Sequence, residues 1–118
     1  MMEKEKIVLF AFRKDPMCFI HVLLNAIDLH ERNQEGLIVL EGEAVTLVPE
    51  ISTPGHFLAT HYRKTKDLGL IAGACNACST KLGVVEAVES EGLPLLDDMF
   101  GHPSMGAFIE KGFQVITF

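Results

Sequence analysis

Short apolar runs that alternate with helix-like segments are the feature that most constrains how this chain can fold. The first run covers residues 7–12 and is apolar at every position, as is typical of a strand covered on both faces. Further apolar runs follow at 37–40, 70–74, 93–97 and 113–118. Strands separated by helices imply parallel crossovers. The sequence therefore predicts an α/β fold, a three-layer α/β/α sandwich with a flavodoxin-like, mainly parallel five-stranded sheet.

The segments between these runs predict helices. Asp15 is expected to cap the first helix, and Pro16 fits its first position, where a missing N–H costs nothing. This helix is expected to run to about residue 33. The remaining segments predict helices at 43–48, 56–68, 83–91 and 103–111, and a loop with two prolines at 49–55.

The composition indicates one globular domain over residues 1–118. Hydrophobic residues make up 48% of the chain and charged residues 22%, which is the balance of a folded protein. The formal net charge of -6 argues against a nucleic-acid binder, because such a protein needs a basic face. We therefore expect no nucleic-acid partner.

The three cysteines indicate a reducing environment. Their number is odd and no apolar leader precedes the first run, so a secreted disulfide framework is not expected. Residues 7–12 are too few to cross a bilayer. We therefore expect a cytoplasmic protein with no membrane span, in which thiols stay reduced unless they are catalytic.

A C-x-x-C motif, Cys75-Asn76-Ala77-Cys78, directly follows the third apolar run. In open α/β sheets, the chemistry lies at the carboxyl ends of the strands. Such a thiol pair cycles between dithiol and disulfide, binds a soft metal, or carries a persulfide. If a helix begins near Asn76, its N-terminus favours a thiolate at Cys75, and Cys78 is the less exposed thiol that resolves a mixed species. The alternative is that both are small buried hydrophobes.

Two loops offer candidate partners for this pair. In a flavodoxin-like strand order the first and third strands are neighbours, so Arg13 and Cys18 would share a crevice with Cys75 and Cys78. His102, in the loop after the fourth strand, would then be either a polar partner for a sulfur anion or an ordinary helix cap. We expect Arg13, Cys18 and His102 to bind the ligand, and the crevice to be electropositive, with Arg13 lowering the pKa of Cys75.

A metal centre is the weaker chemical interpretation. One C-x-x-C supplies two ligands, whereas a closed zinc site needs four, and only Cys18 with His21 or His102 would complete it. The sequence has no second C-x-x-C, and no G-x-G-x-x-G, Walker or G-x-S-x-G motif. We therefore expect neither a metal nor another cofactor.

Several segments together resemble the DsrE/DsrF-like family, especially its small stand-alone members of the YchN type. They are the Arg13-x-Asp15-Pro16 loop, the C-x-x-C, the Leu93-Pro94-Leu95-Leu96-Asp97 segment and the final Val115-Ile116-Thr117-Phe118. The resemblance implies a flavodoxin-like three-layer fold, assembly as trimers or hexamers, and relay of persulfide sulfur. It places the sulfur-carrying cysteine at Cys75. It assigns no role to Cys18 or His102, and this chain departs from the relay subunits in its second thiol, Cys78.

These observations lead to two functional expectations. The first is a sulfur-relay protein, a persulfide carrier or sulfurtransferase, with donor and acceptor proteins as partners. The alternative is a non-enzymatic oligomeric module that binds a small ligand or a metal through Cys and His. A mean hydropathy of +0.27 in so short a chain also predicts a homo-oligomer, because a small domain cannot bury all its apolar surface alone.

Overall fold

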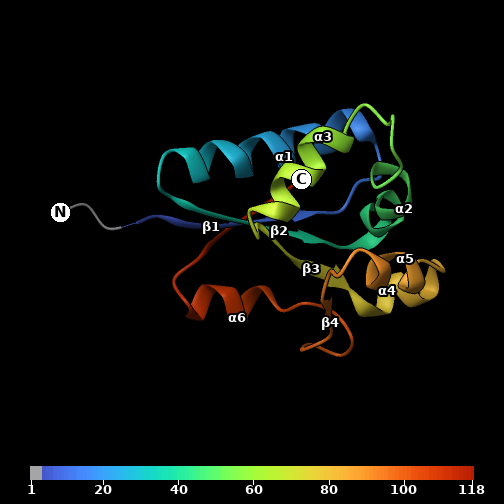
Figure 1. Cartoon of the computed structure of the whole chain (residues 1–118). Helices are drawn as coiled ribbons and strands as arrows, with labels where there is room; N and C mark the ends of the chain where they lie inside the picture. Colours follow the sequence, from blue (N-terminus) through green and yellow to red (C-terminus); the bar gives the residue numbers. More distant parts are fainter. Residues whose placement is uncertain (1–3) are drawn as a thin grey trace.

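The computed structural model describes residues 4–118 and has a five-stranded parallel sheet at its centre (Figure 1). The strands lie in the order β4-β3-β2-β1-β5, and every pair is parallel. The strands are β1 (Lys6–Ala11), β2 (Glu35–Leu40), β3 (Ile71–Cys75), β4 (Leu95–Leu96) and β5 (Gln114–Thr117). The helices are α1 (Pro16–Glu31), the 3₁₀ helix η1 (Gly42–Leu47), α2 (Val48–Ile51), α3 (Ala59–Asp67), α4 (Asn76–Lys81), α5 (Val85–Ser90) and α6 (Met105–Glu110).

Helices cover both faces of the sheet, which confirms the predicted three-layer α/β/α fold. In Figure 1, α1 and α3 lie on one side of the sheet and α6 lies on the other. Successive side chains of β1 alternate between the two faces, so Leu9 joins the core under α1 while Val8 and Phe10 join the core under α6. The α6 core is the thinner of the two, because a single six-residue helix covers it.

All five strands form where the apolar runs predicted them, to within a few residues. Asp15 caps α1 as expected, because its side chain accepts a hydrogen bond from the N–H of Met17. The loop predicted at 49–55 is wrong at its start. There α2 continues directly from η1, and Pro49 fits the first turn of a helix, where its missing N–H costs nothing. Within residues 4–118, none of the helices combines the length and apolar character needed to cross a membrane.

The expected pairing of the first and third strands is wrong. β2 lies between β1 and β3, and β5 occupies the other side of β1. Each of the first four strands pairs with its neighbour in the chain, and only β5 returns to β1. Apolar periodicity reports that a strand exists but carries no information on which strand lies beside it. The carboxyl ends of β1 and β3 are consequently two strand spacings apart, about 10 Å.

A bulge in β3 sets the position of the chain just before the C-x-x-C. The register with β2 shifts at this point, because Ile38 pairs with Ile71 whereas Val39 pairs with Gly73. Gly73 has φ +155, and a Cβ there would lie 2.5 Å from the carbonyl oxygen of Pro94. Glycine is therefore required at residue 73 for β4 to approach β3 and for both strands to end side by side.

Candidate functional site

Cys75 is the last residue of β3 and the N-cap of α4. Its Sγ accepts a hydrogen bond from the N–H of Cys78 at 3.4 Å, so the helix begins where the C-x-x-C motif predicted it. The side chain of Cys75 belongs to the hydrophobic core and is fully buried, whereas Cys78 is half-buried. The expected order of exposure is therefore wrong, because Cys75 ends a central strand and Cys78 lies one turn out along a surface helix.

His102 lies in direct contact with Cys75. Its Nδ1 is 3.1 Å from Sγ of Cys75, which is hydrogen-bonding distance. A tight hairpin holds the histidine there, since the backbones of Met99 and His102 exchange two hydrogen bonds of 2.8 and 2.9 Å. The carbonyl oxygen of Gly101 in this turn accepts from the N–H of Ala77 at 2.9 Å and lies 3.8 Å from Sγ of Cys75. The structure thus brings together the predicted thiol and the predicted histidine.

The tip of this hairpin is strained. Phe100 and Gly101 both have positive φ, +52 and +87, as the two central residues of a type I′ turn do. Glycine and asparagine are usual at such positions, and a bulky residue there costs about 1–3 kcal/mol. The side chain of Phe100 is fully exposed, so no burial offsets this strain. The turn that places Gly101 and His102 against Cys75 therefore includes a strained residue, Phe100.

Glu41 is the site residue that the sequence analysis missed. Its Oε1 lies 3.5 Å from Nδ1 of His102, and only 13% of its side chain is exposed. Burial raises the pKa of the Glu41 carboxyl, although the nearby His102 acts in the opposite direction. Glu41 directly follows the second apolar run, at the edge of the sheet where Cys75 also lies. A polar residue directly after a predicted strand could have identified Glu41 as a candidate site residue from the sequence.

The expected thiolate at Cys75 is also wrong. Burial raises the pKa of Cys75 to about 11, which outweighs the hydrogen bond from the Cys78 N–H. The charge of Glu41 contributes to the same rise. At neutral pH Cys75 is consequently a protonated thiol, and His102 Nδ1 is positioned to accept its proton when it reacts.

One nitrogen of His102 serves both neighbours. Nδ1 faces Sγ of Cys75 and the carboxylate of Glu41, so the three groups do not form a chain through opposite ring nitrogens. An unprotonated Nδ1 accepts a proton from the thiol, and a protonated Nδ1 pairs with the carboxylate. Loss of the proton from the Cys75 thiol is therefore coupled to the positive charge that His102 gains beside the Glu41 carboxylate. We refer to Glu41, Cys75, Cys78 and His102 as the thiol site.

Arg13 and Cys18 lie elsewhere, which corrects two predictions. They line an open hollow of about 450 Å³ near the carboxyl ends of β1 and β5, together with His21, Thr117 and Phe118. We refer to these five residues as the Arg13 hollow. The three cysteines do not share one crevice, because β2 separates β1 from β3. Nor does Arg13 make the thiol site electropositive, since the charged side chain found beside His102 is Glu41.

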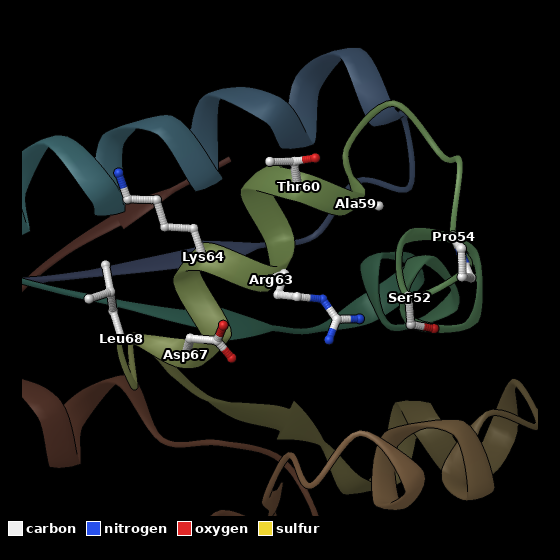
Figure 2. A pocket seen from close by; sticks show the side chains of 8 residues that line it. All are labelled: Ser52, Pro54, Ala59, Thr60, Arg63, Lys64, Asp67 and Leu68. Carbon is white, nitrogen blue, oxygen red and sulfur yellow. The ribbon is translucent and has the colours of Figure 1, made fainter.

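A separate hollow carries neither thiol nor histidine. It has about 500 Å³ and lies between α3 and the loop after α2. Figure 2 shows Arg63 reaching from α3 toward the segment of Ser52, with Asp67 one turn further along the helix. These groups lack the nucleophile and the base that the thiol site combines, so we regard the thiol site as the candidate functional site.

Three donor atoms of the thiol site lie close enough to act together. One ligand atom from each of Cys75, Cys78 and His102 lies within 4.8 Å of the others. These residues can transfer a proton from a thiol to the imidazole, form a disulfide between the two cysteines, or bind a soft metal. These are the chemical capacities that the geometry supports.

Comparison with known proteins finds archaeal relatives. An uncharacterized protein of Methanocaldococcus jannaschii is 35% identical over 97 residues, which span 82% of this chain and 77% of the relative. An uncharacterized protein of Archaeoglobus fulgidus is 34% identical over 62 residues, which span 52% of this chain and the whole relative. No protein-family model matches the chain, and no solved structure matches it.

Proposed function

This chain belongs to the same family as the uncharacterized protein of Methanocaldococcus jannaschii, and we propose that it is a sulfur-relay protein that works through the Cys75–Cys78 pair. The observation that carries the proposal is the contact of 3.1 Å between Sγ of Cys75 and Nδ1 of His102, with a second, more accessible thiol one helical turn away. A relay needs a thiol that meets the donor and a second group that controls its release. The thiol site offers both.

Cys78 is the thiol that meets the sulfur donor, because it is half-buried whereas Cys75 is fully buried. The Cys78 thiolate attacks the outer sulfur of a donor persulfide, R–S–SH. The S–S bond of the donor breaks, R–S⁻ leaves, and Cys78 becomes Cys78–S–SH. An acceptor thiolate then removes that outer sulfur in the same way. No oxidant or reductant is consumed in either step.

Cys75 resolves the persulfide when no acceptor arrives. His102 Nδ1 accepts the Cys75 proton, and the Cys75 thiolate attacks Sγ of Cys78. A Cys75–Cys78 disulfide forms and HS⁻ leaves, so the outer sulfur is released as sulfide. The raised pKa of Cys75 keeps this step slow at neutral pH, which gives the acceptor time to react. The resemblance to the DsrE/DsrF-like family supports sulfur relay, although it points to Cys75 and the burial points to Cys78.

A second copy of this chain is the partner that we propose for the β5 edge of the sheet. Ile109 of α6, the helix just before this strand, is 58% exposed, and Ile116 of β5, which pairs with Leu9 and so lies on the α1 side, is 44% exposed. Apolar side chains exposed around an edge strand favour a symmetric interface, which supports a homo-oligomer, and the resemblance to the DsrE/DsrF-like family points to a trimer or hexamer. Light scattering at micromolar concentration measures the mass, and a value near 13.0 kDa contradicts self-association.

The decisive experiment is intact-mass spectrometry of the reduced protein after exposure to a small persulfide donor. We expect the wild-type protein to gain the mass of one sulfur atom, and the gain to disappear on treatment with reductant. Cys78→Ser should abolish the gain. Cys75→Ser should retain it for longer, because the resolving thiol is absent.

Cys18→Ser is the matched control, since Cys18 lies in the Arg13 hollow and should not affect the gain. If the gain survives Cys78→Ser and is lost in Cys75→Ser, sulfur relay stands and the two thiols exchange roles. If the double variant Cys75→Ser/Cys78→Ser gains sulfur as the wild type does, the proposed function is wrong.

A further inference from the structure

The donor atoms of the thiol site also have the composition of a metal centre. Two cysteine sulfur atoms and a histidine nitrogen lie within 4.8 Å of one another. Thiolate and imidazole are the ligands that zinc prefers in proteins. We propose that Cys75, Cys78 and His102 bind a thiophilic divalent metal, Zn²⁺, and that the Glu41 carboxylate, which lies beside His102 but outside the 4.8 Å cluster, turns toward the ion as the fourth ligand. The inference uses the residues of the proposed function but does not depend on it.

The spacing of the donors supports a tetrahedral ion. Zinc–sulfur and zinc–nitrogen bonds of standard length place a sulfur and a nitrogen ligand about 3.6 Å apart, and two sulfur ligands about 3.8 Å apart. Sγ of Cys75 and Nδ1 of His102 are 3.1 Å apart, so a bound ion would widen this pair by about half an ångström.

Glu41 supplies the independent observation. Its carboxylate is mostly buried, and buried carboxylates rarely occur without a cationic partner or a metal. Its Oε1 lies 3.5 Å from Nδ1 of His102, close to the separation of about 3.4 Å between oxygen and nitrogen ligands of one zinc ion. A divalent cation between these groups compensates the carboxylate more fully than a histidine does. Glu41 reaches the cluster from the end of β2, next to β3.

Metal and sulfur would compete for the same atoms. A metal that displaces the protons of Cys75 and Cys78 occupies both thiolates, so neither attacks a persulfide. Zinc would therefore switch the thiol site from sulfur relay to a closed structural state. This competition is a regulatory property of the site that sulfur relay alone does not require.

The test is titration of the reduced, metal-free protein with Zn²⁺, using Co²⁺ as the spectroscopic probe. We expect one ion per chain, with the thiolate-to-cobalt charge-transfer band and the intense visible bands of tetrahedral Co²⁺. Cys78→Ser and His102→Gln should each remove the charge-transfer band or weaken binding at least tenfold. Glu41→Gln should weaken Zn²⁺ binding by about 10- to 100-fold while the thiolate band remains.

Cys18→Ser is the control that should leave the Co²⁺ spectrum unchanged, and circular dichroism checks that each variant is folded. Because Cys78 and His102 are only partly buried, their variants should fold even if substitution of Cys75 does not. Absence of the charge-transfer band in the wild-type protein, or its persistence in Cys78→Ser at full intensity, overturns the inference. Metal binding without sulfur uptake by the metal-free protein upholds the inference and overturns the proposed function. Sulfur uptake without metal binding does the reverse.

Discussion

Two thiol-bearing regions lie at the same edge of the same sheet, and they differ in almost every physical respect. The thiol site follows β2 and β3, where Cys75 is fully buried against His102 and near Glu41. The Arg13 hollow follows β1 and β5, where Cys18 lies beside a cation in an open space of about 450 Å³. Functional residues of an α/β sheet lie at the carboxyl ends of its strands, but a position at that edge does not by itself bring reactive side chains into contact.

The difference comes from the connections that follow each strand. After β4 the chain folds back in a tight hairpin, and this hairpin delivers Gly101 and His102 to Cys75. After β1 the chain turns directly into α1, so Cys18 lies in the first turn of a helix next to solvent. The contacts of the thiol site should therefore depend on this hairpin and on the burial that it provides.

Gly73→Ala should have the largest effect on stability. A Cβ at residue 73 would lie 2.5 Å from the Pro94 carbonyl oxygen and 2.8 Å from Cγ of Leu96, so β4 must move away from β3. We expect the free energy of unfolding in urea to fall by about 3 kcal/mol or more. Gly55→Ala is the matched control, because its φ is +94 but nothing lies within 4 Å, and only about 1 kcal/mol of backbone strain should appear. Equal losses in the two variants contradict the close approach of β4.

Alkylation should separate the thiol site from the Arg13 hollow by rate. A pKa raised from 9.0 to about 11 lowers the thiolate fraction of Cys75 about 100-fold below that of an ordinary thiol at neutral pH. Cys75 should therefore label last of the three cysteines in time-resolved mass spectrometry, and its rate should rise tenfold per pH unit up to about pH 11. A thiolate at Cys75, as expected from the sequence, would instead make Cys75 label early. If Cys75 labels before Cys18 at neutral pH, burial does not control its reactivity.

The contrast between the two regions also shows what a sequence can predict. The five strands and the start of α1 follow from local patterns, such as the apolar run at 7–12 and the cap formed by Asp15. His102 was predicted as a partner because the loops after neighbouring parallel strands meet at one edge. The strand order, the burial of Cys75 and the role of Glu41 depend on which segments pack together. No local pattern in residues 35–41 indicates that β2 lies between β1 and β3.

Glu41→Gln should stabilise the thiol site at neutral pH. The pKa of Glu41 is raised in the folded protein by burial, so the fold favours its protonated form. Its contribution to stability is present below the ordinary pKa of 4.5 and is lost as the pH rises. Glutamine avoids that loss, so we expect a gain of up to about 1 kcal/mol at pH 7 that disappears in acid. The variant should also lower the pKa of Cys75, because the charge of Glu41 raises it.

Urea unfolding at several pH values and the pH dependence of Cys75 alkylation measure both effects of Glu41→Gln. Glu43→Gln is the control, because Glu43 is an exposed carboxylate two residues away. Loss of stability at pH 7 in Glu41→Gln but not in Glu43→Gln would show that the carboxylate supports the fold through His102, against our expectation.

Phe100→Asn should have the smallest effect and should test how reagents reach Cys75. Phe100 has φ +52 with a fully exposed side chain, so asparagine relieves strain without loss of burial, and we expect a gain of about 0.5–1 kcal/mol. If Cys75 becomes accessible only when the hairpin opens, a more stable hairpin should slow its alkylation about two- to fivefold while Cys18 in the Arg13 hollow labels at an unchanged rate.

The opposite variant is Phe100→Val. Valine is β-branched and strains this turn further, so it should speed the alkylation of Cys75. Stability changes of the expected sign with no change in the Cys75 rate would mean that reagents reach Cys75 by a path that does not involve the hairpin.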